Sequence, residues 1–77
     1  MKQVFDRFGE DVLTEREREI IALVLKGHSS LSIGLVLNIT SGTVKIHRKN
    51  AYKKLAISSQ AELFALFLSL LELRLDY

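Results

Sequence analysis

Proline is absent from this chain of 77 residues, and glycine occurs only four times. Because both residues interrupt helices and mark the turns of sheets, their scarcity permits long helices and argues against a protein of short strands. Apolar residues make up 48% of the chain, which is enough for the core of one small domain. Cysteine is also absent, which excludes disulfides, thiolate metal sites and cysteine nucleophiles. We therefore expect a single all-α domain without a cofactor.

Residues 14–38 contain the start and stop signals of two helices. The first begins with a capping box, in which the Thr14 hydroxyl and the Glu17 carboxylate each accept a hydrogen bond from the other residue's backbone amide. Gly27 ends it in the left-handed conformation. The second helix is short, with Ser29 as its N-cap and Asn38, which tolerates the left-handed conformation, at its end. The side chains expected to face the core are Ile20, Ile21, Leu23, Val24 and Leu25, opposite Ala22, and then Ile33, Val36 and Leu37.

Two further helices are expected beyond residue 39. Thr40 caps a helix that runs to about Leu55, and a second capping box, Ser59–Glu62, starts the last one. Apolar side chains cover well over half of this last helix. A helix on a small domain buries one stripe against its own core, so the remaining apolar surface requires a partner or stays exposed.

The basic side chains are concentrated in the middle of the chain. Residues 20–61 contain six bases and no acid, whereas both flanks carry more acids than bases. Lys45, Lys49 and Lys53 recur every four residues and form one stripe, opposite the face that must be buried. Such a stripe suits a polyanion, of which nucleic acid is the commonest, but charge alone leaves a merely solvated helix face open.

The short second helix, the turn after Asn38 and the basic helix form a helix-turn-helix pattern. Two separated motifs sharpen it: residues 13–19, LTERERE, are similar to an LTxRExE opening, and residues 41–47, SGTVKIH, are similar to an S/E-x-TVKxH signature. Residues 50–57 and 58–62 also match, in register. Over residues 13–68 the sequence thus resembles the LuxR/GerE-type DNA-binding domains. An L-x-x-R-E-R-E opening also occurs in the DNA-binding region of sigma factors, a weaker alternative.

The resemblance implies a four-helix helix-turn-helix domain, at residues 13–77, in a sequence-specific transcriptional regulator. Residues 1–12 would be an N-terminal arm or linker remnant, with Phe5 and Phe8 free to dock. The recognition helix, about residues 41–55, would enter the major groove of double-stranded DNA, and the last helix would form a homodimer. RNA polymerase or a regulatory domain are further candidate partners. We expect a cytoplasmic protein, because the most apolar stretch, residues 63–71, is far shorter than the ~20 residues of a membrane span.

Carried over by position, the resemblance assigns roles to single residues. Lys45 and Lys49 would contact base edges or nearby phosphates, and Ile46 would contact a base through its apolar surface. Backbone phosphates would be contacted by Thr43, Asn50 and Lys53. The guanidinium of Arg48 would reach water or a phosphate, and His47 would either pack half-buried or touch a phosphate. The expected dimer contacts are Leu63, Phe64, Phe67, Leu70 and Leu71.

Several positions depart from the family pattern. Leu31 and Leu35 replace polar residues on the second helix, so the alternative function is a protein-interaction module that uses these side chains and the apolar last helix. Gly34 stands where the family usually has alanine, and Ala56 where it has glycine. His28 and His47 are too few for a metal site, and no catalytic constellation or phosphate-binding loop is present, so we expect no enzyme.

Overall fold

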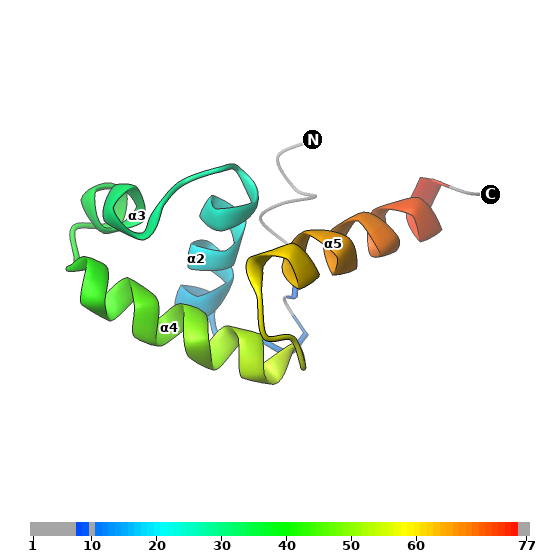
Figure 1. The fold of residues 1–77 in the computed structure, drawn as a ribbon, viewed down its shortest axis with the longest axis horizontal. Coiled ribbons are helices and arrows are strands. Elements are labelled where there is room, and N and C mark those ends of the chain that lie inside the picture. The colour runs from blue at the N-terminus through cyan, green and yellow to red at the C-terminus, as the bar shows by residue number, and fades with distance from the viewer. Residues whose placement is uncertain (1–7, 10, 76–77) are drawn as a thin grey trace.

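The computed structural model describes residues 8, 9 and 11–75, with side chains up to Glu72. The described residues form four helices and no strand, which confirms the predicted all-α helix-turn-helix fold. In chain order the helices are α2 (Glu15–Leu25), α3 (Ser30–Leu37), α4 (Ser41–Lys54) and α5 (Gln60–Leu75) (Figure 1).

Helix α2 begins and ends as its sequence predicts. The Thr14 amide donates to Glu17 Oε1 at 3.0 Å, and the Glu17 amide donates to Thr14 Oγ1 at 3.2 Å, which completes the capping box. At the other end Gly27 has a φ of 97°, and the amide of His28 donates to the Leu23 carbonyl at 3.0 Å. This is the Schellman ending that a left-handed glycine permits.

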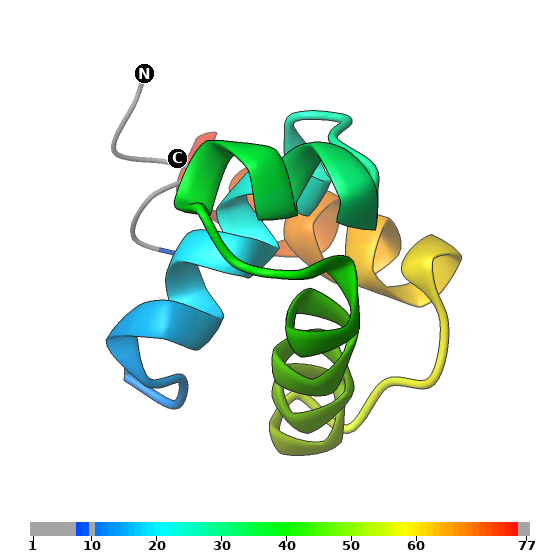
Figure 2. The same ribbon diagram turned by 90° about the vertical axis from the view of Figure 1, so that its left-hand side faces the viewer.

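The turn between α3 and α4 also follows the predicted caps. Ser29 Oγ accepts from the Ser32 amide at 3.1 Å, and Thr40 Oγ1 accepts from the Thr43 amide at 3.1 Å. Asn38, between them, is left-handed with a φ of 60°. These local bonds turn the chain sharply, so that α3 crosses the first turn of α4 (Figure 2).

Gly34 sits where α3 meets this turn. A Cβ added to Gly34 would lie 2.6 Å from the Ile39 carbonyl oxygen, well inside contact distance. The close backbone approach explains a glycine inside a helix, where it lowers helix propensity by ~1 kcal/mol relative to alanine.

The core lies where α2, α3 and α4 meet and extends to the first half of α5. Its fully buried large side chains are Ile20, Ile21, Val24, Ile33, Val44 and Leu63. Two predicted orientations were wrong. Ala22, expected outside, is 4% exposed, because α2 packs against both α3 and α4 and a wide arc of it is covered. Val36, expected inside, is 57% exposed, because the eight-residue α3 turns mainly Ile33 and Gly34 inward.

The α4–α5 junction contains a strained residue. Ala56 has a φ of 58°, and its amide donates to the Lys53 carbonyl at 3.1 Å while the Ile57 amide donates to the Tyr52 carbonyl at 3.0 Å. This is again a Schellman ending, but with alanine at the left-handed position, which costs ~1–2 kcal/mol.

Ala56→Gly is therefore expected to raise the free energy of unfolding by about 1 kcal/mol, since glycine removes the left-handed strain but adds chain entropy to the unfolded state. Urea denaturation followed by circular dichroism measures the change. Ala65→Gly, at an exposed position inside α5, is the matched control and should lower the free energy by about 1 kcal/mol. A loss of stability in both variants would contradict the strain at Ala56.

The start of α5 differs in one bond from the predicted capping box. Ser59 Oγ accepts from the Glu62 amide at 3.1 Å, as expected. The Glu62 carboxylate, however, accepts from the Ser58 amide at 3.0 Å and from the Ser58 and Ser59 hydroxyls, so it reaches one residue further back than the Ser59 amide. These hydrogen bonds, first of all the one from the Ser58 hydroxyl, lower the pKa of Glu62.

Helix α5 is anchored by its first half and extends away from the other three helices (Figure 1). Phe67 is 7% exposed and meets the ring of Phe8 edge-on, with 5.4 Å between the ring centroids. The predicted docking of Phe8 is therefore confirmed, whereas Phe5 lies outside the described residues. The division of the chain at residue 13 stays a prediction.

Within the part of the chain that the structure describes, no helix is both long and apolar enough to cross a membrane.

Candidate nucleic-acid interface

Helix α4 exposes one continuous face on the side away from α2 and α3. It buries Val44 and Ala51 against those helices, so the opposite side faces solvent (Figure 1). The exposed side chains on it include five of the predicted DNA contacts: Lys45, Ile46, Lys49, Asn50 and Lys53. A large apolar side chain among these polar ones stands out, because Ile46 is 62% exposed.

The lysines on this face have no acidic partner among the described residues. Lys45, Arg48, Lys49 and Lys53 line a hollow of about 290 Å³ beside the start of the α4–α5 turn, together with Tyr52, Ile57 and Ser58. Every charged side chain of this hollow is a cation, so it suits an anionic group such as a phosphate.

The three remaining predicted contacts lie at the edges of the face. Thr43 is half-buried in the first turn of α4, and its hydroxyl shares a hydrogen bond of 2.9 Å with that of Thr40. His47 is half-buried on the flank of α4. Arg48 Nη1 donates to Ser30 Oγ at 3.0 Å, which links α4 to the first residue of α3.

Tyr52 lies between the buried and the exposed side of α4. From the sequence of the helix its hydroxyl is predicted to lie at the rim of the domain, but Tyr52 Oη is buried and has no hydrogen-bond partner among the described residues. Burial of the phenol raises the pKa of Tyr52, since the phenolate would lose its hydration, and the nearby Arg48 charge lowers it less.

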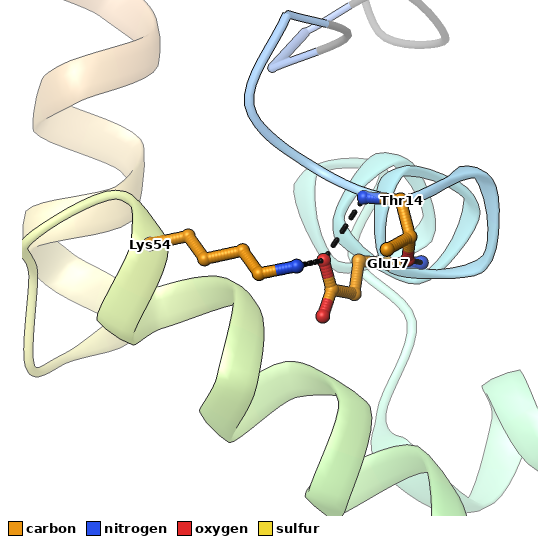
Figure 3. A network of polar contacts seen from close by, with 3 residues as sticks. All are labelled: Thr14, Glu17 and Lys54. Atoms are coloured by element: carbon orange, nitrogen blue, oxygen red, sulfur yellow. Dashed lines mark hydrogen bonds and ion pairs between the residues drawn. The ribbon is translucent and has the colours of Figure 1, made fainter.

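One lysine of α4, Lys54, does not belong to the exposed face, because it forms an ion pair with Glu17 that was not predicted from the sequence. Lys54 Nζ donates to Glu17 Oε1 at 2.8 Å, and the same oxygen accepts from the Thr14 amide (Figure 3). Glu17 is only 5% exposed, so its charge is well shielded from water. The hydrogen bond from Lys54 lowers the pKa of Glu17, more than burial raises it. Sequence reasoning assigned Glu17 to the capping box, but Glu15 and Glu19 flank it, and nothing in the spacing selects Glu17 as the partner of a lysine 37 positions away.

The predicted dimer residues on α5 fall into two groups. Leu63 is fully buried and Phe67 is 7% exposed, and both pack in the core of their own chain. They are therefore not free to form an interface, since the same face that anchors α5 uses them. Phe64 and Leu71 are half-buried and Leu70 is 44% exposed. Leu68, which was not assigned to the interface, is 53% exposed beside them.

The apolar residues of α3 are as exposed as expected but are not next to α5. Leu31 and Leu35 are 67% and 77% exposed. Figure 1 places α3 and α5 at opposite ends of the molecule, whose longest extent is 41 Å. The sequence also suggested that Leu31 and Leu35 lie beside the apolar last helix in one patch, and this expectation was wrong, because α2 and α4 separate α3 from α5.

Known proteins are similar to this chain in sequence. The family model described as "Bacterial regulatory proteins, luxR family" matches residues 11–67. An HTH-type transcriptional regulator in the exeN 3' region of Aeromonas salmonicida is 46% identical over 69 residues, which cover 90% of this chain and 35% of that protein. The transcriptional regulatory protein MctR of Rhizobium johnstonii is 49% identical over 55 residues, or 71% of this chain and 26% of MctR. The nitrate/nitrite response regulator protein NarP of Escherichia coli is 42% identical over 57 residues, or 74% of this chain and 26% of NarP.

The chain thus spans about a third or less of the length of these curated relatives. No solved structure matches it. The family is one of DNA-binding transcriptional regulators and not of enzymes. The match over most of the chain, the four helices and the helix-turn-helix geometry agree, and this chain belongs to the LuxR family of bacterial regulatory proteins.

Proposed function

We propose that this domain binds double-stranded DNA sequence-specifically, as part of a transcriptional regulator, with α4 in the major groove. The observation that supports this most directly is the exposed face of α4, where lysines with no acidic partner in the described part of the chain lie beside the exposed Ile46. An α-helix fits the major groove, and side chains on one face of it can reach base edges and backbone together.

The contacts divide by chemistry. Lys45 and Lys49 donate to guanine acceptors or to nearby phosphates, and Ile46 packs on a thymine methyl group. Thr43, Asn50 and Lys53 contact backbone phosphates, which position the helix without specifying sequence.

Two further residues lie at the edge of this interface. Arg48 holds Ser30 and reaches a phosphate from there, and its aliphatic stem stays on the core. His47 is half-buried, which favours a packing role over a phosphate contact.

We further propose a homodimer through α5. Its outer surface presents Phe64, Leu68, Leu70 and Leu71, while Leu63 and Phe67 hold the helix to its own domain. A two-fold dimer of this kind places two copies of α4 in successive major grooves, one helical turn apart.

Selection of bound duplexes from a random DNA pool tests both proposals together. We expect a two-fold symmetric consensus whose half-sites lie about 10 base pairs apart, and an affinity that falls steeply with salt. A consensus without two-fold symmetry would refute the proposed homodimer. If no sequence is enriched even at low salt, the proposal of sequence-specific DNA binding is refuted.

The protein-interaction reading has one specific observation in its favour, the exposure of Leu31 and Leu35. It predicts protein association without salt-sensitive DNA binding. Lys45, Lys49 and Lys53, which have no acidic partner among the described residues, favour DNA binding, so we treat the exposed leucines of α3 as an addition to that function.

A further inference from the structure

Helix α3 carries an apolar surface that the fold does not cover. Leu31, Leu35 and Val36 are 67%, 77% and 57% exposed, and we call these three side chains the α3 surface. Single exposed leucines are ordinary, but three large apolar side chains on one eight-residue helix indicate a contact site.

The charges around the α3 surface favour a contact with a second copy of this chain. Residues 27–44 contain no lysine, arginine, aspartate or glutamate, although the chain is basic overall. Arg48, from α4, donates to Ser30 at the start of α3. A self-contact here therefore avoids the like-charge repulsion that the lysines of α4 would cause.

On its Val36 side the α3 surface adjoins charges of both signs. Where α3 meets α2, a groove of about 380 Å³ is lined by Val36 and Leu37 and by two acids and two bases. The four charged residues are Glu15, Arg18, Glu19 and Lys26. In a two-fold contact the same patch of both copies meets, so the acids of one copy can face the bases of the other.

The position of the α3 surface indicates which copies meet. Helix α3 lies at the end of the molecule opposite α5 (Figure 1). This step rests on the proposed DNA-bound dimer: if α5 joins two chains at the centre, the two α3 surfaces face outward along the duplex. Each then points toward whatever occupies the neighbouring DNA.

The contact is too small to hold dimers together in solution. A stable interface uses about 20–30 residues on each side, and the α3 surface offers three apolar side chains. Such a contact becomes effective when a shared duplex raises the local concentration of the partners. We propose that the α3 surface joins two dimers of this protein bound at adjacent sites on DNA, and thereby makes their binding cooperative.

Cooperativity is measured on duplexes that carry one or two copies of the consensus selected by the protein itself. With the two sites separated by whole helical turns, we expect the second dimer to bind about tenfold more tightly, the effect of burying roughly one leucine. An added half-turn places the dimers on opposite faces of the DNA and should abolish the gain.

The double variant Leu31→Ser, Leu35→Ser should lose the cooperativity and keep its affinity for a single site within about twofold. Val12→Ser, which removes a 53% exposed side chain elsewhere, is the matched control and should remain cooperative. Helix content by circular dichroism verifies that both variants fold.

The outcomes separate this inference from the function on which it rests. The unaltered protein could fill the two sites independently at every spacing while binding a single site normally. That result would refute the α3 contact and would leave the proposed DNA binding unaffected. Cooperativity that survives in the double variant would also overturn it. If the dimers fill sites independently but the double variant loses binding to RNA polymerase, the occupant is another protein and the inference is wrong. No single-site binding would refute the proposed function itself.

Discussion

Replacing Lys45 and Lys49 together with alanine is expected to weaken specific DNA binding about a hundredfold, because each lost contact to a base edge or phosphate is worth roughly 1–3 kcal/mol. Both side chains are exposed and lie outside the core, so the fold should be unaffected. Fluorescence anisotropy with the selected duplex, repeated over a salt series, measures the change. If both lysines neutralise phosphates, the slope of the logarithm of the binding constant against the logarithm of the salt concentration should become less steep by about 2 per domain.

Lys26→Ala is the matched control, since it removes the same charge from the end of α2 and lies outside the cationic hollow of α4. It should change the affinity by less than about threefold, which is the size of a screened long-range charge effect. A double variant that binds as tightly as the unaltered protein would show that α4 is not the DNA-contacting helix.

Replacing Glu17 with alanine is expected to lower the free energy of unfolding by about 2–3 kcal/mol. The change removes the cap on the Thr14 amide, worth about 1 kcal/mol, and a charge-assisted hydrogen bond to Lys54, worth about 1.5–3 kcal/mol before solvent screening. Lys54 is 39% exposed, so its freed ammonium can regain water, which keeps the loss below that of a fully buried pair. Urea denaturation measures the loss.

Glu19→Ala tests whether any acid of α2 would behave in this way. Glu19 is 48% exposed and pairs with Arg16 at 3.4 Å on the surface, so its replacement should cost no more than about 0.5 kcal/mol. Lys54→Met in the Glu17→Ala background should add little further loss, because the two residues share one interaction. Equal losses in the Glu17 and Glu19 variants would refute the role of the ion pair.

The same ion pair gives the fold an acid-sensitive component. The pKa of Glu17 is lower in the folded protein than its ordinary value of 4.5, so the unfolded chain binds the proton more readily. The contribution of Glu17 to stability is therefore complete above pH 4.5 and disappears as the pH falls through the folded pKa. Glu17→Gln should flatten the acid limb of the stability curve.

Local signals in the sequence sufficed for the helix boundaries. The caps at Thr14, Ser29 and Thr40 and the left-handed ends at Gly27 and Asn38 involve residues at most four or five positions apart, so their geometry follows from the chain itself. The Glu62 carboxylate shows the limit of this reasoning, because two adjacent serines offered it a choice of partners.

Side-chain environments that depend on several helices were predicted less well. Ala22 is buried because α3 and α4 both pack against α2. The pattern of apolar residues within a single helix cannot show how many neighbouring helices cover it. For the same reason the ion pair between Lys54 and Glu17 could not be predicted from the sequence. Nor could the sequence show that Leu63 and Phe67 are buried in the core and do not lie on the outer surface of α5. The exposed face of α4 was predictable, since an amphipathic helix with one buried stripe must turn its charges outward.

Tyr52 has a practical consequence for work on this protein. The chain has no tryptophan and only two tyrosines, and Tyr52 belongs to α4, with its ring lining the cationic hollow. Its phenol is shielded from solvent. We therefore expect the ultraviolet emission of this side chain to change when the hollow is occupied, which would report binding without an attached dye.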